Sequence, residues 1–112
     1  MIHELRLNKG PYNSIKAGTK TVEMRLYDEK RQQIKVGDYI LFKERDNEQN
    51  QLKVLVKTLD VYNNFNELYK HYDKVSLGYS LDEDAKPEDM TQYYPIEEQA
   101  MFGVVAIGIE LV

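Results

Sequence analysis

The sequence of 112 residues has no cysteine, no tryptophan and only two histidines. Without cysteine there is no disulfide framework, no thiol nucleophile and no thiolate metal site. His3 and His71 stand far apart and belong to no partnering motif, so neither a zinc site nor a Ser-His-Asp triad is indicated. The chain also lacks a glycine-rich phosphate loop. We therefore expect no metal ligands and no cofactor.

Long apolar runs are absent as well. No segment approaches the ~20 apolar residues that cross a bilayer, and the N-terminus has no apolar core of a signal peptide. We expect a cytoplasmic protein without membrane contact. The length fits one domain over residues 1–112, and a hydrophobic content of 42% with 30% charged residues is ordinary for a globular chain.

The net charge of −4 is unevenly distributed. Residues 1–81 carry 14 Lys and Arg against 11 Asp and Glu, whereas residues 82–112 carry one lysine against eight acids. The first part can present a mildly basic face to a nucleic acid. The acidic segment 82–89 is a candidate docking site for a basic protein partner. The alternative is a scatter of charges over a solvated surface.

Alternating apolar residues and turn signals predict strands at residues 3–7, 20–26, 39–43, 52–61 and 102–112. A polar hairpin loop is expected at 46–51. Apolar residues on both parities of 52–61 suggest a wall covered on its outer side. Helices are predicted from Gly10-Pro11 to Gly18, after the Asn64/Glu67 capping box and at 87–94, with a second capping pattern at Ser80/Glu83. This order predicts an α+β fold, a small mixed β-barrel with short flanking helices.

The segment from Gly18 to Arg25 holds a lysine, a glutamate and an arginine within six positions. On a strand, one face carries the apolar residues Val22, Met24 and Leu26, and the other carries Thr21, Glu23 and Arg25. Lys20 has the wrong parity, so it joins Glu23 and Arg25 only if it lies where the preceding loop meets the strand. The cluster is either a ligand site or an ion pair on a solvated face.

The residues Pro11-Tyr12, Ile15, Gly18-x-Lys20-x-x-Glu23-x-Arg25 and Val36-Gly37-Asp38 together resemble the ASCH family of the PUA-like superfamily. Tyr94-Pro95 and residues 103–107 are similar to the end of that family's domain. The resemblance covers nearly the whole chain. It implies a PUA-like barrel of five to six strands with a cleft lined by the G-x-K-x-x-E-x-R signature, and it implies binding of RNA or of a nucleotide-like molecule.

The resemblance also implies an alternative, a small metal-independent hydrolase of a modified nucleoside or of RNA. One bacterial branch of the family hydrolyses acetylcytidine with the signature lysine, a threonine and a glutamate from a later helix, and another has been credited with ribonuclease activity. Lys20 matches the lysine. Glu23 stands where the threonine falls, and Glu67 corresponds to the helical glutamate by rough location only. If the chain is an enzyme, Lys20 and Glu23 are its candidate catalytic residues.

For binding, the candidate residues are Tyr12, Lys20, Thr21, Glu23, Arg25, Lys43 and Arg45. An arginine fork suits a phosphate or the acceptor edge of a base, and a carboxylate accepts from an exocyclic amine. Lys43 and Arg45 would extend a basic rim. Candidate platforms for base stacking are Tyr12, Tyr27, Tyr39 and Tyr79. Packing roles are expected for Tyr69, Tyr72, Tyr93 and Tyr94.

Overall fold

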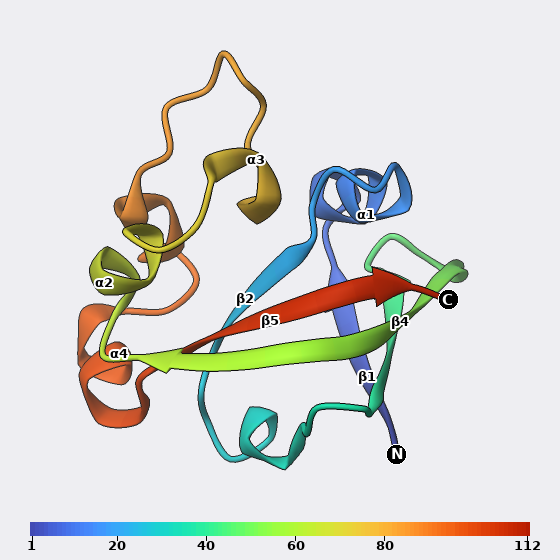
Figure 1. The fold of residues 1–112 in the computed structure, drawn as a ribbon, viewed down its shortest axis with the longest axis horizontal. Helices are drawn as coiled ribbons and strands as arrows, with labels where there is room; N and C mark the ends of the chain where they lie inside the picture. The colour runs from blue at the N-terminus through green and yellow to red at the C-terminus, as the bar shows by residue number, and fades with distance from the viewer.

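A computed structural model describes residues 1–112 and shows a five-stranded mixed sheet curled into a half-barrel (Figure 1). The strands are β1 (Ile2–Leu7), β2 (Val22–Leu26), β3 (Tyr39–Glu44), β4 (Asn47–Tyr62) and β5 (Val104–Leu111). Their order in the sheet is β1-β3-β4-β5-β2, with β1 and β3 parallel and all other pairs antiparallel. The sheet therefore has two edge strands, β1 and β2.

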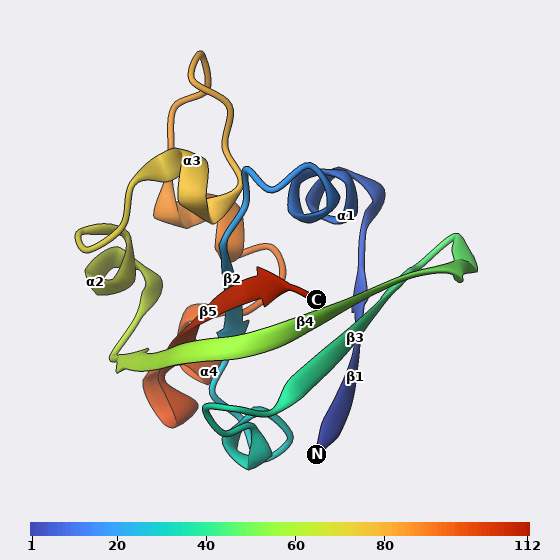
Figure 2. The ribbon, with the colours of Figure 1, turned by 45° about the vertical axis from the view of Figure 1, so that its right-hand side comes forward.

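Short helices occupy two places around the sheet (Figure 2). Helix α1 (Lys9–Lys16) packs on β1 and β3, whereas α2 (Phe65–Tyr69), α3 (Lys74–Leu77) and α4 (Ile96–Phe102) pack beside β2, β4 and β5. Two 3-10 turns, η1 (Arg31–Gln33) and η2 (Pro87–Met90), lie in the connections. No helix has the length and apolar character that would let it cross a membrane. The expected α+β class is confirmed.

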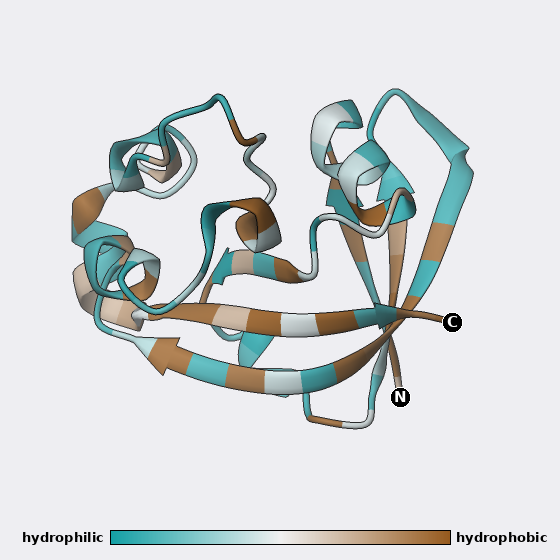
Figure 3. Cartoon of the chain, turned by 45° about the horizontal axis from the view of Figure 1, so that its top comes forward, coloured by the Kyte–Doolittle hydropathy of each residue, from teal (hydrophilic) through white to brown (hydrophobic).

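The hydrophobic core has two parts, one on each face of the sheet. The inner part fills the half-barrel and includes Leu5, Ile40, Phe42, Val54 and Ile107. The outer part lies under the helices of the second half and comprises Val22, Met24, Leu26, Phe65, Leu68, Leu77, Val104 and Ala106. Strand β5 contributes alternate residues to both parts and is coloured hydrophobic along most of its length (Figure 3). Its continuous apolar sequence follows from this burial on both faces.

The mixed parity of apolar residues in β4 has a different cause from the one the sequence suggested. The register of β4 against β5 shifts between Val56 and Thr58. Val54 and Val56 point into the half-barrel before the shift, and Leu59 packs against the same core after it. A bulge moves the inward parity from even to odd positions. The prediction of a covered outer face is wrong, since the outward residues Lys53, Thr58 and Asp60 are exposed.

Other predicted elements needed correction. Strand β4 begins at Asn47, so the polar residues 47–51 extend a β-ribbon instead of forming a loop. The Asn64 cap is confirmed by its side chain, which accepts a hydrogen bond from the Glu67 N–H at 2.9 Å. Ser80 and Glu83 make similar reciprocal contacts, but no helix follows them.

The predicted helix at 87–94 is reduced to η2, and the sequence analysis missed both α3 and α4. Lys86, next to Pro87, is extended, as the residue before a proline usually is. Helix α4 is held by tertiary contacts of Gln99, whose side-chain oxygen accepts from the Phe65 N–H at 3.1 Å. Its exposed Ile96 and Met101 gave no clear helical stripe.

Candidate functional site

Strand β2 is buried on both faces, and this burial defines the site. Val22, Met24 and Leu26 pack in the outer core, as the alternation predicted, and Glu23 and Arg25 lie on the opposite face. That face is the inside of the half-barrel, so Glu23 is only 5% and Arg25 only 7% exposed. The alternative of an ion pair on a solvated face is wrong. Two charged side chains inside a barrel need partners to offset their desolvation.

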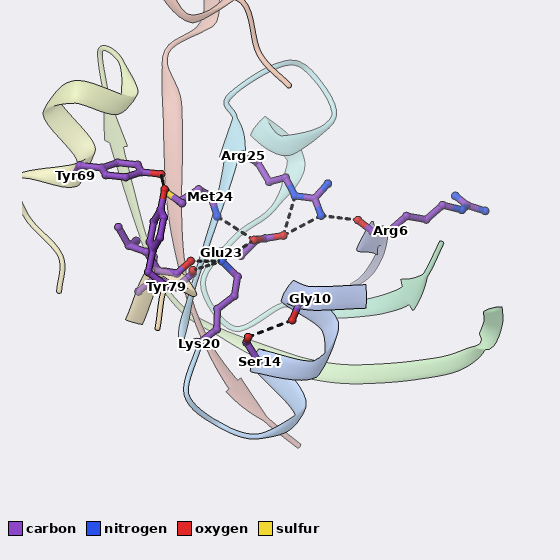
Figure 4. Close-up of polar contacts among 11 residues, drawn as sticks. Arg6, Gly10, Ser14, Lys20, Glu23, Met24, Arg25, Tyr69 and Tyr79 are labelled. Carbon is purple, nitrogen blue, oxygen red and sulfur yellow. Dashed lines mark hydrogen bonds and ion pairs between the residues drawn. The ribbon is translucent and has the colours of Figure 1, made fainter. Parts of the chain in front are cut away.

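The Glu23 carboxylate is the centre of this cluster (Figure 4). Its Oε1 accepts a hydrogen bond from the Met24 N–H at 3.1 Å and lies 3.2 Å from Lys20 Nζ. Its Oε2 accepts from Arg25 Nε at 3.0 Å and lies 2.9 Å from Arg25 Nη2. A carboxylate has about four acceptor positions. All of them face protein donors here.

Lys20 stands in the loop just before β2, where strand alternation has not begun. Its Nζ donates to the carbonyls of Leu77 at 2.7 Å and Val22 at 3.0 Å, besides its contact with Glu23. An ammonium group has three donors, so each has an acceptor. Gly78, with φ of +112°, ends α3 and admits the lysine stem, because a Cβ there would lie 3.1 Å from Lys20 Cδ.

Arg25 joins the two edge strands of the sheet. Its Nη2 donates to the Arg6 carbonyl on β1 at 2.7 Å, and its Nε holds Glu23. The third nitrogen, Nη1, bonds to no carboxylate or carbonyl, and the Tyr94 side chain also forms a hydrogen bond with the guanidinium group. The signature residues therefore tie α3 to β2 and β2 to β1. Because these contacts engage Nε and Nη2 of Arg25, Nη1 is the nitrogen through which this side chain can reach a ligand.

The electrostatics of the cluster favour the charged forms. Burial alone would raise the pKa of the Glu23 carboxyl, but the charges of Arg25 and Lys20, with their hydrogen bonds, outweigh it and hold the pKa below its usual range. Burial would likewise lower the pKa of Arg25, yet Glu23 and then Tyr94 raise it above its usual value. Glu23 and Arg25 are thus a stable ion pair at neutral pH.

A cleft of about 930 Å³ opens beside this cluster. Its charged lining residues are Arg6, Lys20, Glu23, Arg25, Arg31, Arg45, Glu83 and Asp89. All four arginines of the chain line this cleft, but only one of its eleven lysines does. The guanidinium group is the side chain best matched to phosphate and carboxylate. Arginine is therefore concentrated where an anion would bind, and lysine is distributed elsewhere.

The two walls of the cleft differ in chemistry. The arginine wall holds Arg6, Arg31 and Arg45 from the first half of the chain, and the tyrosine wall, from the second half, holds Tyr69, Tyr79, Tyr93 and Tyr94 with the carboxylates of Glu83 and Asp89. No cation lies on that second wall. One side of the cleft offers hydrogen-bond donors, and the other offers aromatic rings with acceptors.

A chain of hydrogen bonds fixes the polarity of the tyrosine wall. Tyr79 Oη donates to Asp89 Oδ2 at 2.9 Å, and it lies 2.8 Å from Tyr69 Oη. Because Tyr79 directs its proton to Asp89, Tyr69 is the donor in the second bond, and its own oxygen keeps acceptor capacity. Burial, followed by the bond to Tyr79, raises the pKa of Tyr69 well above its usual value. The phenol stays neutral.

The predicted binding residues divide into two groups. Lys20, Glu23, Arg25 and Arg45 line the cleft, whereas Tyr12, Thr21 and Lys43 do not. Tyr12 is part of the inner core, and Thr21 lies at the surface with its N–H bonded to the Ser76 carbonyl. Lys43 points to Glu4, with its Nζ 3.3 Å from that carboxylate. No residue of β3 lines the cleft, and Arg45 lies just beyond the end of that strand.

The tyrosines are distributed differently from the prediction. Tyr79 lines the cleft, but Tyr27 packs against the inner core and Tyr39 lies under Lys53, 4.5 Å from its ring centre. Three tyrosines expected only to pack, Tyr69, Tyr93 and Tyr94, line the cleft. Glu67, the rough match to a helical catalytic glutamate, pairs with Lys70 at 3.0 Å and lies outside the lining.

The sequence analysis missed Arg6 and Arg31. Both stand outside the signature, on β1 and in η1, and no local pattern marks them. The available signal was residue identity, because the arginine side chain suits bidentate recognition of phosphate and carboxylate better than lysine does. Across the whole protein, no group of three or more His, Cys, Asp or Glu side chains could hold a metal ion.

The acidic segment 82–89 contributes to the second wall. Glu83 and Asp89 face the cleft, and Lys74 Nζ donates to the carbonyls of Leu81 and Glu83 at 2.8 and 2.6 Å. Glu83 Oε1 accepts two hydrogen bonds from Ser80, and these bonds lower the pKa of the Glu83 carboxyl. Docking of a protein partner on this segment stays a prediction.

The curled sheet with its signature cluster in the opening between edge strands defines a PUA-like protein. A model of the ASCH domain matches residues 3–112, so the chain belongs to the ASCH domain family. The hypothetical protein PH0355 is similar over the whole length of both chains, with 38% identity and a TM-score of 0.83. Protein PF0455 from Pyrococcus furiosus is 36% identical with a TM-score of 0.69, covering 100% of this chain and 98% of that one.

More distant structures share the fold alone. The S128A mutant of ZmASCH from Zymomonas mobilis has a TM-score of 0.71 at 14% identity, and the match covers 97% of this chain and 67% of that chain. No curated protein matches the chain. The family expected from the signature is thus confirmed.

Proposed function

We propose that this protein binds RNA or a nucleotide-like molecule in the cleft between its arginine and tyrosine walls. The observation that carries this proposal is that all four arginines of the chain line this cleft together with four of its nine tyrosines. Arginine binds phosphate oxygens through paired N–H groups. A tyrosine ring stacks on any base, and such stacking contributes about 1–3 kcal/mol per base.

The hydrogen-bonding groups of the walls match the two ends of a nucleotide. Arg25 Nη1 and the exposed Arg45 offer donors to phosphate or carbonyl oxygens. The free lone pairs of Tyr69 Oη and the carboxylates of Glu83 and Asp89 offer acceptors to an amino group. Carboxylates accept in this way from the exocyclic amine of cytosine.

The geometry supports binding more than hydrolysis. A catalytic lysine or glutamate needs a lone pair that is free to take a proton from the substrate or from water. Lys20 Nζ has an acceptor for each of its donors, and both oxygens of Glu23 face two donors each. Either group would have to break contacts that hold the edge strands before it could act.

An amide NMR titration of the ¹⁵N-labelled protein tests the proposal. The additions are a short single-stranded RNA, cytidine and acetylcytidine, with the ligand signals followed for chemical change. We expect shifts at Lys20 to Arg25 and at the cleft tyrosines, lost or weakened in Tyr93→Ala. Tyr93 is 55% exposed and lines the cleft, so its loss should reduce affinity by about 1–3 kcal/mol without unfolding.

Tyr39→Ala is the matched control, because Tyr39 lies on β3 outside the cleft. It should leave the affinity unchanged. Salt dependence separates a strand from a single nucleotide: a strand that neutralises three or four phosphates gives a log–log slope of roughly −2 to −3. Absence of shifts with every ligand would contradict the proposal, and turnover of acetylcytidine or RNA would move the protein to the hydrolase class.

A further inference from the structure

One nitrogen of the Arg31 side chain is buried without a hydrogen bond. Its Nε is the one buried side-chain nitrogen or oxygen without a hydrogen-bond partner. The same residue is well fixed at other atoms, since its Nη1 donates to Asp28 Oδ2 at 2.6 Å and its backbone N–H donates to Asp28 Oδ1 at 3.2 Å. A buried donor of a charged group is nearly always paired. The Nε of Arg31 therefore lacks an acceptor within the protein.

A second arginine of the same cleft has free donors. Arg25 is 7% exposed, and its Nη1 bonds to no carboxylate or carbonyl, whereas Nε and Nη2 are both engaged and the Tyr94 side chain adds one hydrogen bond. Arg31 Nη2 is also without a partner. Both side chains line the cleft, and both are fixed by a carboxylate at other atoms, Glu23 for Arg25 and Asp28 for Arg31. Two guanidinium groups held by carboxylates thus line one cleft, and each keeps one terminal nitrogen, Nη1 of Arg25 and Nη2 of Arg31, without a carboxylate or carbonyl acceptor.

We infer that Arg25 and Arg31 form an anion subsite that takes the phosphate group of the ligand. This inference rests on the proposed function and narrows the ligand to a nucleotide or an RNA phosphate instead of a neutral nucleoside. A phosphate offers several acceptor oxygens at once, which suits two guanidinium groups that arrive from different segments. Glu23 and Asp28 each use part of their arginine and keep the free donors directed at the anion.

The experiment compares cytidine with cytidine 5′-monophosphate by calorimetry and by NMR of the arginine Nε–Hε groups. Because the chain has four arginines, this spectrum holds only four such signals. We expect the monophosphate to bind at least about tenfold more tightly than the nucleoside, and to shift the Arg31 signal. In Arg31→Gln the preference should fall to about twofold or less. Lys35→Gln, an exposed loss of the same charge four residues away and outside the cleft, should keep it.

The outcomes separate the subsite from the proposed function. Equal affinities for nucleoside and monophosphate, or a preference that survives in Arg31→Gln, would overturn the subsite and leave nucleotide binding in place. If cytidine, its monophosphate and RNA all fail to bind, the proposed function fails. Inorganic phosphate then tests the subsite alone: a saturable shift of the Arg31 Nε–Hε signal, absent in Arg31→Gln, would support it, and no shift would overturn it.

Discussion

The floor and the rim of the cleft use charged residues in opposite ways. On the floor, Lys20, Glu23 and Arg25 are almost completely buried and direct nearly every donor and acceptor at one another or at the backbone. On the rim, Arg31 has unpartnered donors and Arg45 is exposed without an ion pair. The residues of the G-x-K-x-x-E-x-R motif therefore build the floor, whereas most of the other charged groups that line the cleft lie outside that motif.

This difference separates two roles that a clustered charged motif can have, which are to hold the fold together and to bind a ligand. The floor residues join α3, β2 and β1 across the opening of the half-barrel, where the sheet has no backbone hydrogen bonds between its edges. A buried ion cluster fixes one arrangement of these elements, because any other arrangement would leave a charge unpaired. The rim can vary its residues without disturbing that arrangement.

The largest expected effect is on the floor. Glu23→Ala leaves Lys20 and Arg25 buried together without a counter-charge, and removal of one partner from such a cluster costs about 3–5 kcal/mol. We expect the free energy of unfolding, measured in urea, to fall by that amount. Glu110→Ala is the control, because Glu110 is 61% exposed and pairs with Lys57 on the surface. A similar loss of stability in both variants would show that the buried cluster contributes no more than an exposed ion pair.

The same carboxylate predicts an acid dependence of stability. The pKa of Glu23 is lower in the folded protein than its ordinary value of 4.5, so the unfolded chain binds more protons in the window between the two values. Stability contributed by Glu23 is therefore complete above about pH 4.5 and is lost as the pH falls through the folded-state pKa. Urea unfolding from about pH 7 to pH 3 should show a steeper loss in the wild type than in Glu23→Gln. Parallel curves would contradict this assignment.

Gly78 tests how the floor is held by α3. Its φ of +112° disfavours any side chain, and a Cβ would lie 3.1 Å from Lys20 Cδ. Gly78→Ala should reduce stability by about 1–2 kcal/mol and move the amide signals of Lys20 and Glu23. Gly10→Ala, in helix α1 with open space around it, should be neutral or stabilising by about 0.5–1 kcal/mol. Equal effects of the two substitutions would exclude a contact with Lys20 as the cause.

Sequence alone predicted the parts of this fold that depend on local pattern. The alternation in β2, the Asn64 cap and the apolar β5 strand are all local signals, and the structure has each of them. The signature also located Lys20, Glu23 and Arg25 together. What it could not give was their environment, because burial of the second face of β2 depends on the curl of a sheet whose edges are far apart in sequence.

The cleft itself was less predictable. Arg6, Arg31 and Tyr69 come from three elements that meet only in the folded chain, so no spacing rule connects them. The prediction that Tyr12 binds the ligand was wrong for the converse reason. Tyr12 is close to the signature in sequence, but it lies in the inner core. Helix α4 could not be predicted for a similar reason, because it is held by contacts of Gln99 with α2, and no local sequence pattern indicates these contacts.

The smallest effect on stability, and a clear one on binding, is expected at the rim. Arg45 lines the cleft, is exposed and forms no ion pair, so Arg45→Gln should change the free energy of unfolding by less than about 0.5 kcal/mol. If Arg45 meets a phosphate of bound RNA, its loss should weaken binding equally for all sequences and reduce the salt slope by about 0.7. Fluorescence anisotropy with a labelled RNA at several salt concentrations measures both quantities.

Lys43→Gln removes the same charge two residues away, from a side chain that points to Glu4 outside the cleft. If Arg45 makes a specific contact, the salt slope changes only in Arg45→Gln. Equal changes in both variants would show that Arg45 acts only through the overall electrostatic attraction between the protein and RNA.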